Sequence, residues 1–197
     1  LAAALPSLPA EKRGDFGSLL AVLRRPYFAR GLLAAVLSWG SAFMMFTYLR
    51  PFLEQVTQVD VTTLSVLLLV LGGAGFLGTW GSARLIGPRI APLLKLPALV
   101  MGACTILLLF LGGSVVGTAI LLAIWGAMNT AMSVIWMTWM SRNVDDAPEA
   151  GGSLMVAGVQ ASIMLGAVLG GLLLDGISIQ AVLAGSVALA VAALALI

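Results

Sequence analysis

Stretches without any acidic or basic side chain divide the chain into segments long enough to cross a membrane. They cover residues 31–49, 61–83, 96–141, 150–174 and 176–197. A helix needs roughly 20 apolar residues to span the hydrocarbon layer. The third stretch is too long for one crossing, and its Gly112-Gly113-Ser114 is a turn signal that splits it. The pattern therefore predicts an all-α membrane protein with six transmembrane helices, because an isolated apolar segment in lipid must satisfy its own backbone hydrogen bonds.

The first 30 residues form a polar lead-in with no room for a core of their own. We therefore divide the chain into a cytoplasmic segment over residues 1–30 and a six-helix transmembrane bundle over residues 31–197. The chain begins with Leu1, and its opening residues lack the basic stretch of a signal peptide. We expect it to be a fragment or a processed form of a longer protein.

The composition agrees with a membrane protein and excludes several other classes. Hydrophobic residues make up 61% of the chain and charged residues only 9%, whereas soluble domains are about half apolar and a quarter charged. This argues against a water-soluble enzyme, a disordered chain and a nucleic-acid partner. The chain has no histidine and one cysteine, Cys104, which excludes His-ligated metal sites and Ser-His or Cys-His catalytic sets. We expect no enzyme activity, no metal and no cofactor.

Basic residues are distributed unequally between the two sides of such a bundle. If the six spans alternate in direction, nine basic residues fall on one side and only Arg50 on the other. The nine are Lys12, Arg13, Arg24, Arg25, Arg30, Arg84, Arg89, Lys95 and Arg142. Because cytoplasmic loops of membrane proteins are rich in Lys and Arg, this predicts that both termini lie in the cytoplasm.

Acidic residues lie outside the middle of every predicted span. The sequence Asp146-Ala147-Pro148-Glu149 is typical of a helix start, with Asp146 as the N-cap and an early proline. Asp175 ends the fifth span. The chain therefore shows no carboxylate placed for proton coupling.

Small residues recur every four positions on two of the spans. The fifth span carries Gly158, Ser162, Gly166 and Gly170, and the second span carries Gly78 in a similar row. Such ridges let helix backbones approach closely in lipid. We expect the four glycines to serve helix packing, and they could also let the helices slide or rock during gating.

Polar and aromatic side chains mark the fourth span. Asn129, Ser133 and Trp136 belong to one stripe of this helix, which should face protein or a water-filled cavity rather than lipid. The alternative is a satisfied asparagine packed between helices. Gln160, on the fifth span, points away from the glycine ridge of its helix. It is the second amide, after Asn129, that lies deep within a predicted span.

The first span has two candidate inward faces. Ser38, Ser41, Met45 and Tyr48 share one of them, and Trp39, Phe43, Phe46 and Arg50 share the other. The sequence alone does not decide between them. The third and sixth spans carry few polar groups, so we expect them to be outer, lipid-facing helices.

Three stretches resemble a known family of transporters. They are Arg24-Arg25-Pro26 leading to the run from Phe46 to Pro51, the run from Trp136 to Arg142, and the fifth span with its glycines. Together they resemble the C-terminal half of major facilitator superfamily transporters, in the drug and sugar efflux antiporter branch, especially the purine ribonucleoside efflux type. The stretch from Gly81 to Arg89 resembles a degenerate second copy of the family's Gly-x-x-x-Asp-Arg-x-Gly loop, without its Asp.

The resemblance implies a twelve-helix bundle of which this chain is one half. Helices seven and ten of the family line the cavity, eight and eleven meet the other half, and nine and twelve face lipid. It implies proton-coupled export of a small organic solute (drug, sugar or nucleoside-like) across the inner (plasma) membrane, with a missing N-terminal six-helix half as partner. The expected substrate-binding residues are Tyr48, Arg50, Asn129, Ser133, Trp136 and Gln160. The alternative is an autonomous six-span channel or an oligomeric membrane scaffold.

Overall fold

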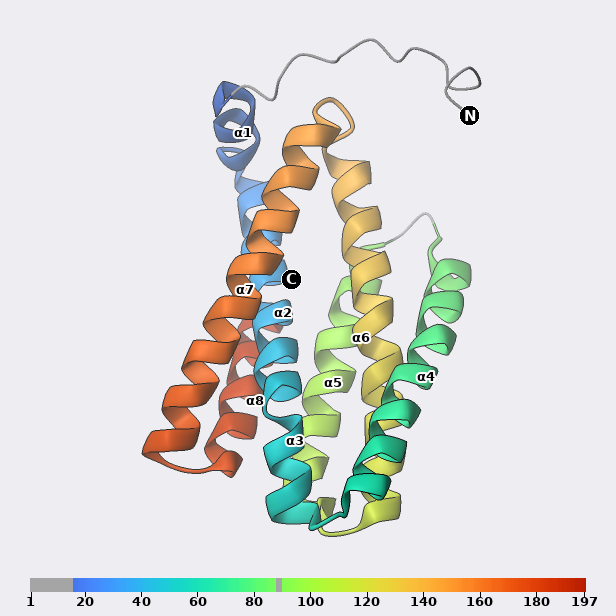
Figure 1. The fold of residues 1–197 in the computed structure, drawn as a ribbon. Helices are drawn as coiled ribbons and strands as arrows, with labels where there is room; N and C mark the ends of the chain where they lie inside the picture. Colours follow the sequence, from blue (N-terminus) through green and yellow to red (C-terminus); the bar gives the residue numbers. More distant parts are fainter. Residues whose placement is uncertain (1–15, 88–89) are drawn as a thin grey trace, which may run out of the picture.

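The computed structural model of the protein describes residues 16–87 and 90–197, and all regular structure in this part of the chain is helical (Figure 1). Among these described residues, six helices are long and apolar enough to cross a membrane, which confirms the predicted number. They are α2 (Pro26–Thr47), α4 (Val61–Leu85), α5 (Ala91–Leu111), α6 (Val115–Asn143), α7 (Pro148–Gly176) and α8 (Ile179–Leu196). The short elements are α1 (Phe16–Leu23), α3 (Leu49–Phe52) and a π-helical turn (Leu53–Thr57). Of the predicted cytoplasmic segment, residues 1–15 lie outside the described residues.

Side-chain caps fix where several helices begin. Asp60 accepts a hydrogen bond from the backbone of Thr63 at the start of α4, and Ser114 and Ser178 cap α6 and α8 in the same way. Each cap satisfies one of the free backbone N–H groups of a first helical turn. Asp146 does not act as the predicted cap, because the N-cap of α7 is Ala147 and has no side-chain cap bond.

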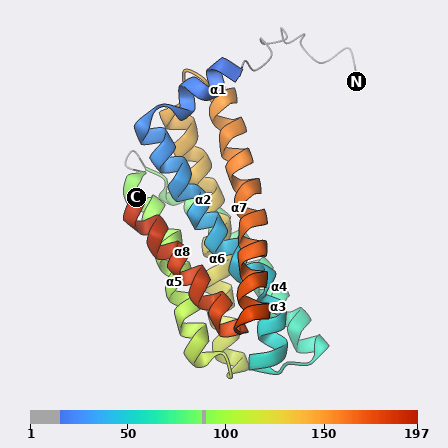
Figure 2. The same cartoon turned by 90° about the vertical axis from the view of Figure 1, so that its left-hand side faces the viewer.

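The helices form two groups of three (Figures 1 and 2). In one group α2 packs against α7 and α8, and in the other α6 packs against α4 and α5. Contacts between α5 and α8 join the two groups. The first three spans correspond in order to the last three, so that α2 matches α6, α4 matches α7 and α5 matches α8. When each helix is replaced by its counterpart, the contacts of one group become the contacts of the other. The bundle is therefore internally repeated, as many transporter folds are.

The buried share of each helix does not follow from the number of polar side chains that the helix carries. Of the most apolar 18 residues of each helix, 44% are buried in α5 and 33% in α8, against only 22% in α4 and 17% in α7. Within this chain α5 and α8 are thus not the least buried helices, and their expected lipid-facing position in the membrane stays a prediction. The physical reason is that an apolar side chain suits a neighbouring helix as well as it suits lipid.

Candidate functional site

Aromatic side chains connect α2 and α6, which make few direct backbone contacts. The Trp39 and Trp136 rings lie 6.4 Å apart between centroids, and Phe46 stacks on Trp125 at the same distance. Nearer the start of α2, Phe28 stacks on Trp139 at 5.9 Å. The face of α2 that carries Trp39 and Phe46 therefore points toward α6.

The other candidate face of α2 packs against α8. Ser38, Ser41 and Met45 are buried. The hydroxyl of Ser186 on α8 donates to the Ser41 carbonyl oxygen at 2.8 Å, and the two serine hydroxyls are 3.2 Å apart. Hydrogen bonds of this kind hold membrane helices together, so Ser41 helps to pack this face of α2 against α8.

The predicted stripe on α6 separates into a buried aromatic part and an open polar part. Trp136 is only 1% exposed, and its indole N–H has no acceptor among the described residues. Asn129 is half-buried and Ser133 is exposed. Neither side chain makes a hydrogen bond within the described part of the chain, so the Asn129 amide keeps its donors and its acceptor free for a ligand.

Tyr48 directly follows α2 as its C-cap, and Arg50 lies in the short helix α3 that comes next. The Tyr48 hydroxyl donates to the carbonyl oxygen of Ala167 at 2.6 Å, and its ring lies against Gly170 on α7. Arg50 is exposed and its Nε donates to Glu54 at 2.8 Å. Tyr48 thus holds α2 against α7. The sequence did not predict this contact between the run from Phe46 to Pro51 and the glycine row of the fifth span.

Gln160 does not join the other candidates. It is exposed on α7, about 200° around the helix axis from Gly158, and makes no side-chain hydrogen bond to the described residues. The structure brings Trp136, Asn129 and Ser133 together on α6, but it does not gather all six predicted substrate residues into one pocket.

The predicted glycines lie where the helix backbones come closest. A Cβ atom at Gly166 would be 2.9 Å from the Gly40 carbonyl oxygen on α2, and one at Gly78 would overlap the backbone of Ala127 on α6. Gly158 likewise lies against α2, where a Cβ atom would come within 3.1 Å of two side chains. At Gly78 and Gly166 the neighbouring atoms belong to the backbone, so a larger residue would push two helices apart, whereas at Gly158 they are the ends of side chains.

A cluster of polar contacts ties together the helix ends near the start of α2. The guanidinium group of Arg25 donates to both carboxylate oxygens of Asp146, at 2.8 and 2.5 Å. Because of this pair, the pKa of Asp146 lies below its ordinary value and that of Arg25 above it. Tyr27 donates to the carbonyl oxygen of Asn143 at 2.8 Å. No local pattern could have predicted a pair separated by 121 residues.

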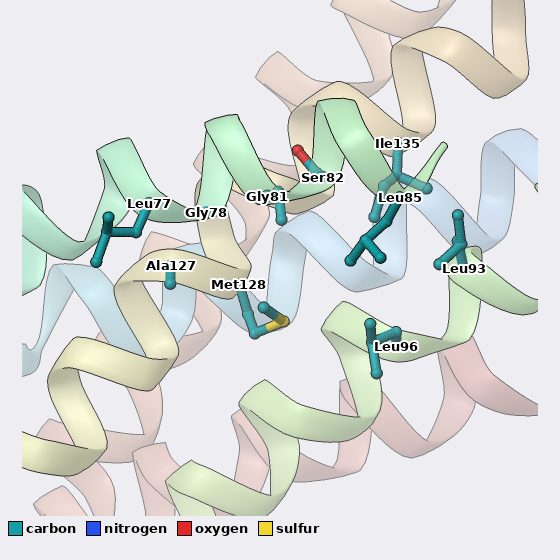
Figure 3. Close-up of a pocket in the computed structure, with 11 residues that line it drawn as sticks. Leu77, Gly78, Gly81, Ser82, Leu85, Leu93, Leu96, Ala127, Met128 and Ile135 are labelled. Atoms are coloured by element: carbon teal, nitrogen blue, oxygen red, sulfur yellow. The ribbon is translucent and has the colours of Figure 1, made fainter. Parts of the chain in front are cut away.

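An apolar cavity of about 150 Å³ lies elsewhere, between α4, α5 and α6 (Figure 3). Of the predicted site residues only Gly78 lines it. Within the described residues there is also no group of three or more His, Cys, Asp or Glu side chains that could hold a metal ion.

These features define the class of protein as a multi-pass helical membrane protein, and comparisons with known proteins narrow the choice. Over 189 residues the chain is 41% identical to a protein of Pseudomonas aeruginosa named transcription regulatory protein OpdE, covering 94% of this chain and 47% of the relative. Over 180 residues it is 32% identical to the purine ribonucleoside efflux pump NepI of Salmonella enteritidis and of Salmonella typhimurium, with 91% and 45% covered. The chain spans about half the length of the curated relatives it matches. No protein-family model matches it.

Proposed function

We propose that the chain is one six-helix half of a twelve-helix secondary transporter of the major facilitator type. This transporter exports a small, nucleoside-like organic solute by proton antiport with alternating access. The observation that carries the proposal is the match along 91% of the chain to efflux pumps about twice its length. We follow the name efflux pump rather than the regulatory name, because six apolar helices account for most of the described residues.

The exposed faces of α4 and α7 support the proposal that a second six-helix half packs against this chain. These two helices bury the smallest share of their spans, and their small-residue rows already pack within the chain, against α6 and α2. Large apolar side chains are exposed on both of them, including Leu69 and Phe76 on α4 and Met164, Val168 and Leu172 on α7. In the proposed transporter these faces meet the N-terminal six-helix half.

The proposed solute path runs along the open side of the α2–α6 pair. Asn129 and Ser133 would hydrogen-bond the solute, and Trp136 would form the aromatic wall beneath it. Tyr48 and Arg50 would close the outer end of the path. Gln160 would reach the solute only from the side of α7 that the second half covers.

The basic residues support an inner-membrane orientation with both termini in the cytoplasm. Single cysteines at Gly87 and Gly113, in a background where the native cysteine is replaced by alanine, test it directly. Neither glycine has a neighbouring atom within 4 Å of an added Cβ, so both positions tolerate a side chain. Impermeant thiol reagents should label the two from opposite sides, and labelling from one side would contradict the orientation.

The function is tested by transport into inverted membrane vesicles with a purine ribonucleoside such as inosine as the probe. A chain that carries both halves should give saturable uptake that an imposed pH gradient drives. The 197-residue chain alone, reconstituted in liposomes, should give none, because its open α4 and α7 faces would lack their partner. Saturable flux by the chain alone would instead favour an autonomous six-span channel or oligomer.

A further inference from the structure

The cavity between α4, α5 and α6 marks a place where the internal repeat is broken. In one group α7 and α8 pack against each other, but the corresponding helices α4 and α5 hardly touch although only a short loop separates them. Each of them packs on α6 instead, and the space left between them is the cavity of about 150 Å³. An opening of this size has room for an occupant, which would restore the contacts that the cavity walls otherwise forfeit.

The walls of the cavity select an apolar occupant. Its lining includes Leu77, Leu85, Leu93, Leu96, Met128 and Ile135, and Figure 3 shows these side chains around one space. The polar exception is Ser82, whose hydroxyl already donates to the carbonyl oxygen of Thr79 at 2.9 Å. Apolar cavities of this volume stay dry and accept hydrocarbon.

The cavity opens toward the membrane rather than toward the solute path. Leu77 and Leu85, which line it on α4, are 69% and 65% exposed. It lies beside the last turns of α4 and the first turns of α5, which is the cytoplasmic leaflet in the proposed orientation. A lipid acyl chain of that leaflet can therefore enter it from the side.

Two arginines lie near the ends of the helices that line the cavity, although neither of them lines it. Arg84 directly precedes Leu85 and is held over the Trp80 ring, 3.7 Å from its centroid. Arg142 lies on the same face of α6 as Ile135, two turns further on, and one of its nitrogens donates to the Gly87 carbonyl oxygen at 2.8 Å. The sequences of α4, α5 and α6 contain no acidic residue, so nothing on these helices neutralises the two charges.

We propose that this cavity is a binding site for an anionic phospholipid of the cytoplasmic leaflet. A segment of one acyl chain occupies the space between α4, α5 and α6, and the phosphate group pairs with Arg84 and Arg142. Basic pockets between helices on the cytoplasmic side are suited to such headgroups. The inference does not depend on what solute the protein exports, only on its position in the membrane.

The test measures which lipids stay bound to the purified protein. The protein is exchanged into bilayer discs of phosphatidylcholine with phosphatidylglycerol, and the retained lipids are counted by native mass spectrometry. The wild-type protein should retain phosphatidylglycerol in preference to phosphatidylcholine. Gly81→Leu fills the cavity without a backbone clash, because nothing lies within 4 Å of a Cβ at this position. It should lower phosphatidylglycerol retention on the order of tenfold, as the loss of two buried methylene groups would.

The headgroup contacts are tested separately from the cavity. Arg84→Gln and Arg142→Gln should each lower retention of phosphatidylglycerol about fivefold, and leave retention of phosphatidylcholine unchanged. The matched controls are Gly73→Leu, on the open side of α4, and Arg24→Gln, an exposed arginine on the same side of the membrane. Both should bind like the wild type. The unfolding temperature of each variant is measured, and Gly81→Val replaces Gly81→Leu if the latter does not fold.

Three outcomes would overturn the proposal. Unchanged retention in the folded Gly81 variant would mean that no acyl chain occupies the cavity. Unchanged retention in both arginine variants would mean that phosphatidylglycerol is held elsewhere. Equal retention of phosphatidylcholine and phosphatidylglycerol by the wild type would mean that the site does not select anionic lipid.

Discussion

Replacing Gly166 by leucine tests whether the small-residue ridge of α7 holds this helix against α2. A Cβ atom at Gly166 would lie 2.9 Å from the carbonyl oxygen of Gly40 and 3.1 Å from the backbone nitrogen of Met44. Both are backbone atoms of α2, which cannot rotate away as the end of a flexible side chain can. The two helices must therefore separate, and the separation also disturbs the contact of Tyr48 with Gly170 one turn further on.

The size of the effect follows from two opposing contributions. Adding atoms to a tightly packed contact costs about 1–3 kcal/mol or more, and a leucine against backbone lies at the upper end. The same change gains up to about 1 kcal/mol, because glycine is a poor helix former. The net loss is about 2 kcal/mol, which corresponds to roughly 4–8 °C in unfolding temperature for a chain of this length. Membrane insertion should stay normal, because leucine favours the membrane interior.

The assay is thermal unfolding in detergent. Unfolding is detected by a fluorescent thiol reagent that reacts with Cys104, which is buried in the folded protein. Gly73→Leu is the matched control, because it removes a glycine from a helix at a position where nothing lies within 4 Å of an added Cβ. This control should unfold at the wild-type temperature or above it. If Gly166→Leu unfolds at the same temperature as Gly73→Leu, the ridge does not hold α7 against α2.

Single changes at three other contacts test other parts of the structure. Asn129→Ala should weaken apparent affinity in the inosine transport assay with near-normal expression, and unchanged kinetics would remove Asn129 from the solute path. Thr130→Val deletes the hydroxyl that donates to the Gly75 carbonyl oxygen at 2.7 Å between α6 and α4, and should lower stability by about 0.6 kcal/mol in thermal unfolding. Because Arg25 lowers the pKa of Asp146 from 3.8, their ion pair should contribute fully above that pH and be lost as the pH falls through the lowered value. The difference in unfolding temperature between the wild type and Asp146→Asn should accordingly stay constant from pH 7 to 5 and shrink in stronger acid.

The number of helices could be predicted from the sequence, but their ends could not. The criterion of a charge-free stretch placed the start of the first span at residue 31 and that of the third at residue 96, whereas α2 begins at Pro26 and α5 at Ala91. Each helix continues through a basic residue, Arg30 or Lys95, whose long side chain can reach the polar layer while its backbone stays helical. Charge therefore marks the edge of the hydrocarbon layer and not the end of the helix.

The inward face of α2 could not be predicted, because both of its faces meet other helices. Trp39 faces α6 and Ser41 faces α8, so each face is buried and each looks inward from the sequence. Which face borders a path depends on where α6 and α8 lie, and that is set by contacts between residues more than 90 positions apart. The same holds for Arg25 and Asp146, which become partners only when the ends of α2 and α6 meet.

The four-residue spacing of small residues predicted one packed strip of α4, and Gly75, outside that row, is buried against α6 as well. On α4, Gly78 and Ser82 belong to a row with a four-residue period, and both are buried. Gly72 and Gly73 lie outside this row on the same helix, and an added Cβ atom at either would meet nothing within 4 Å. The reason is geometric, because four residues at 3.6 per turn return to nearly the same side of a helix. A periodic row therefore forms a continuous strip along which a second backbone can lie, whereas scattered glycines expose only isolated points.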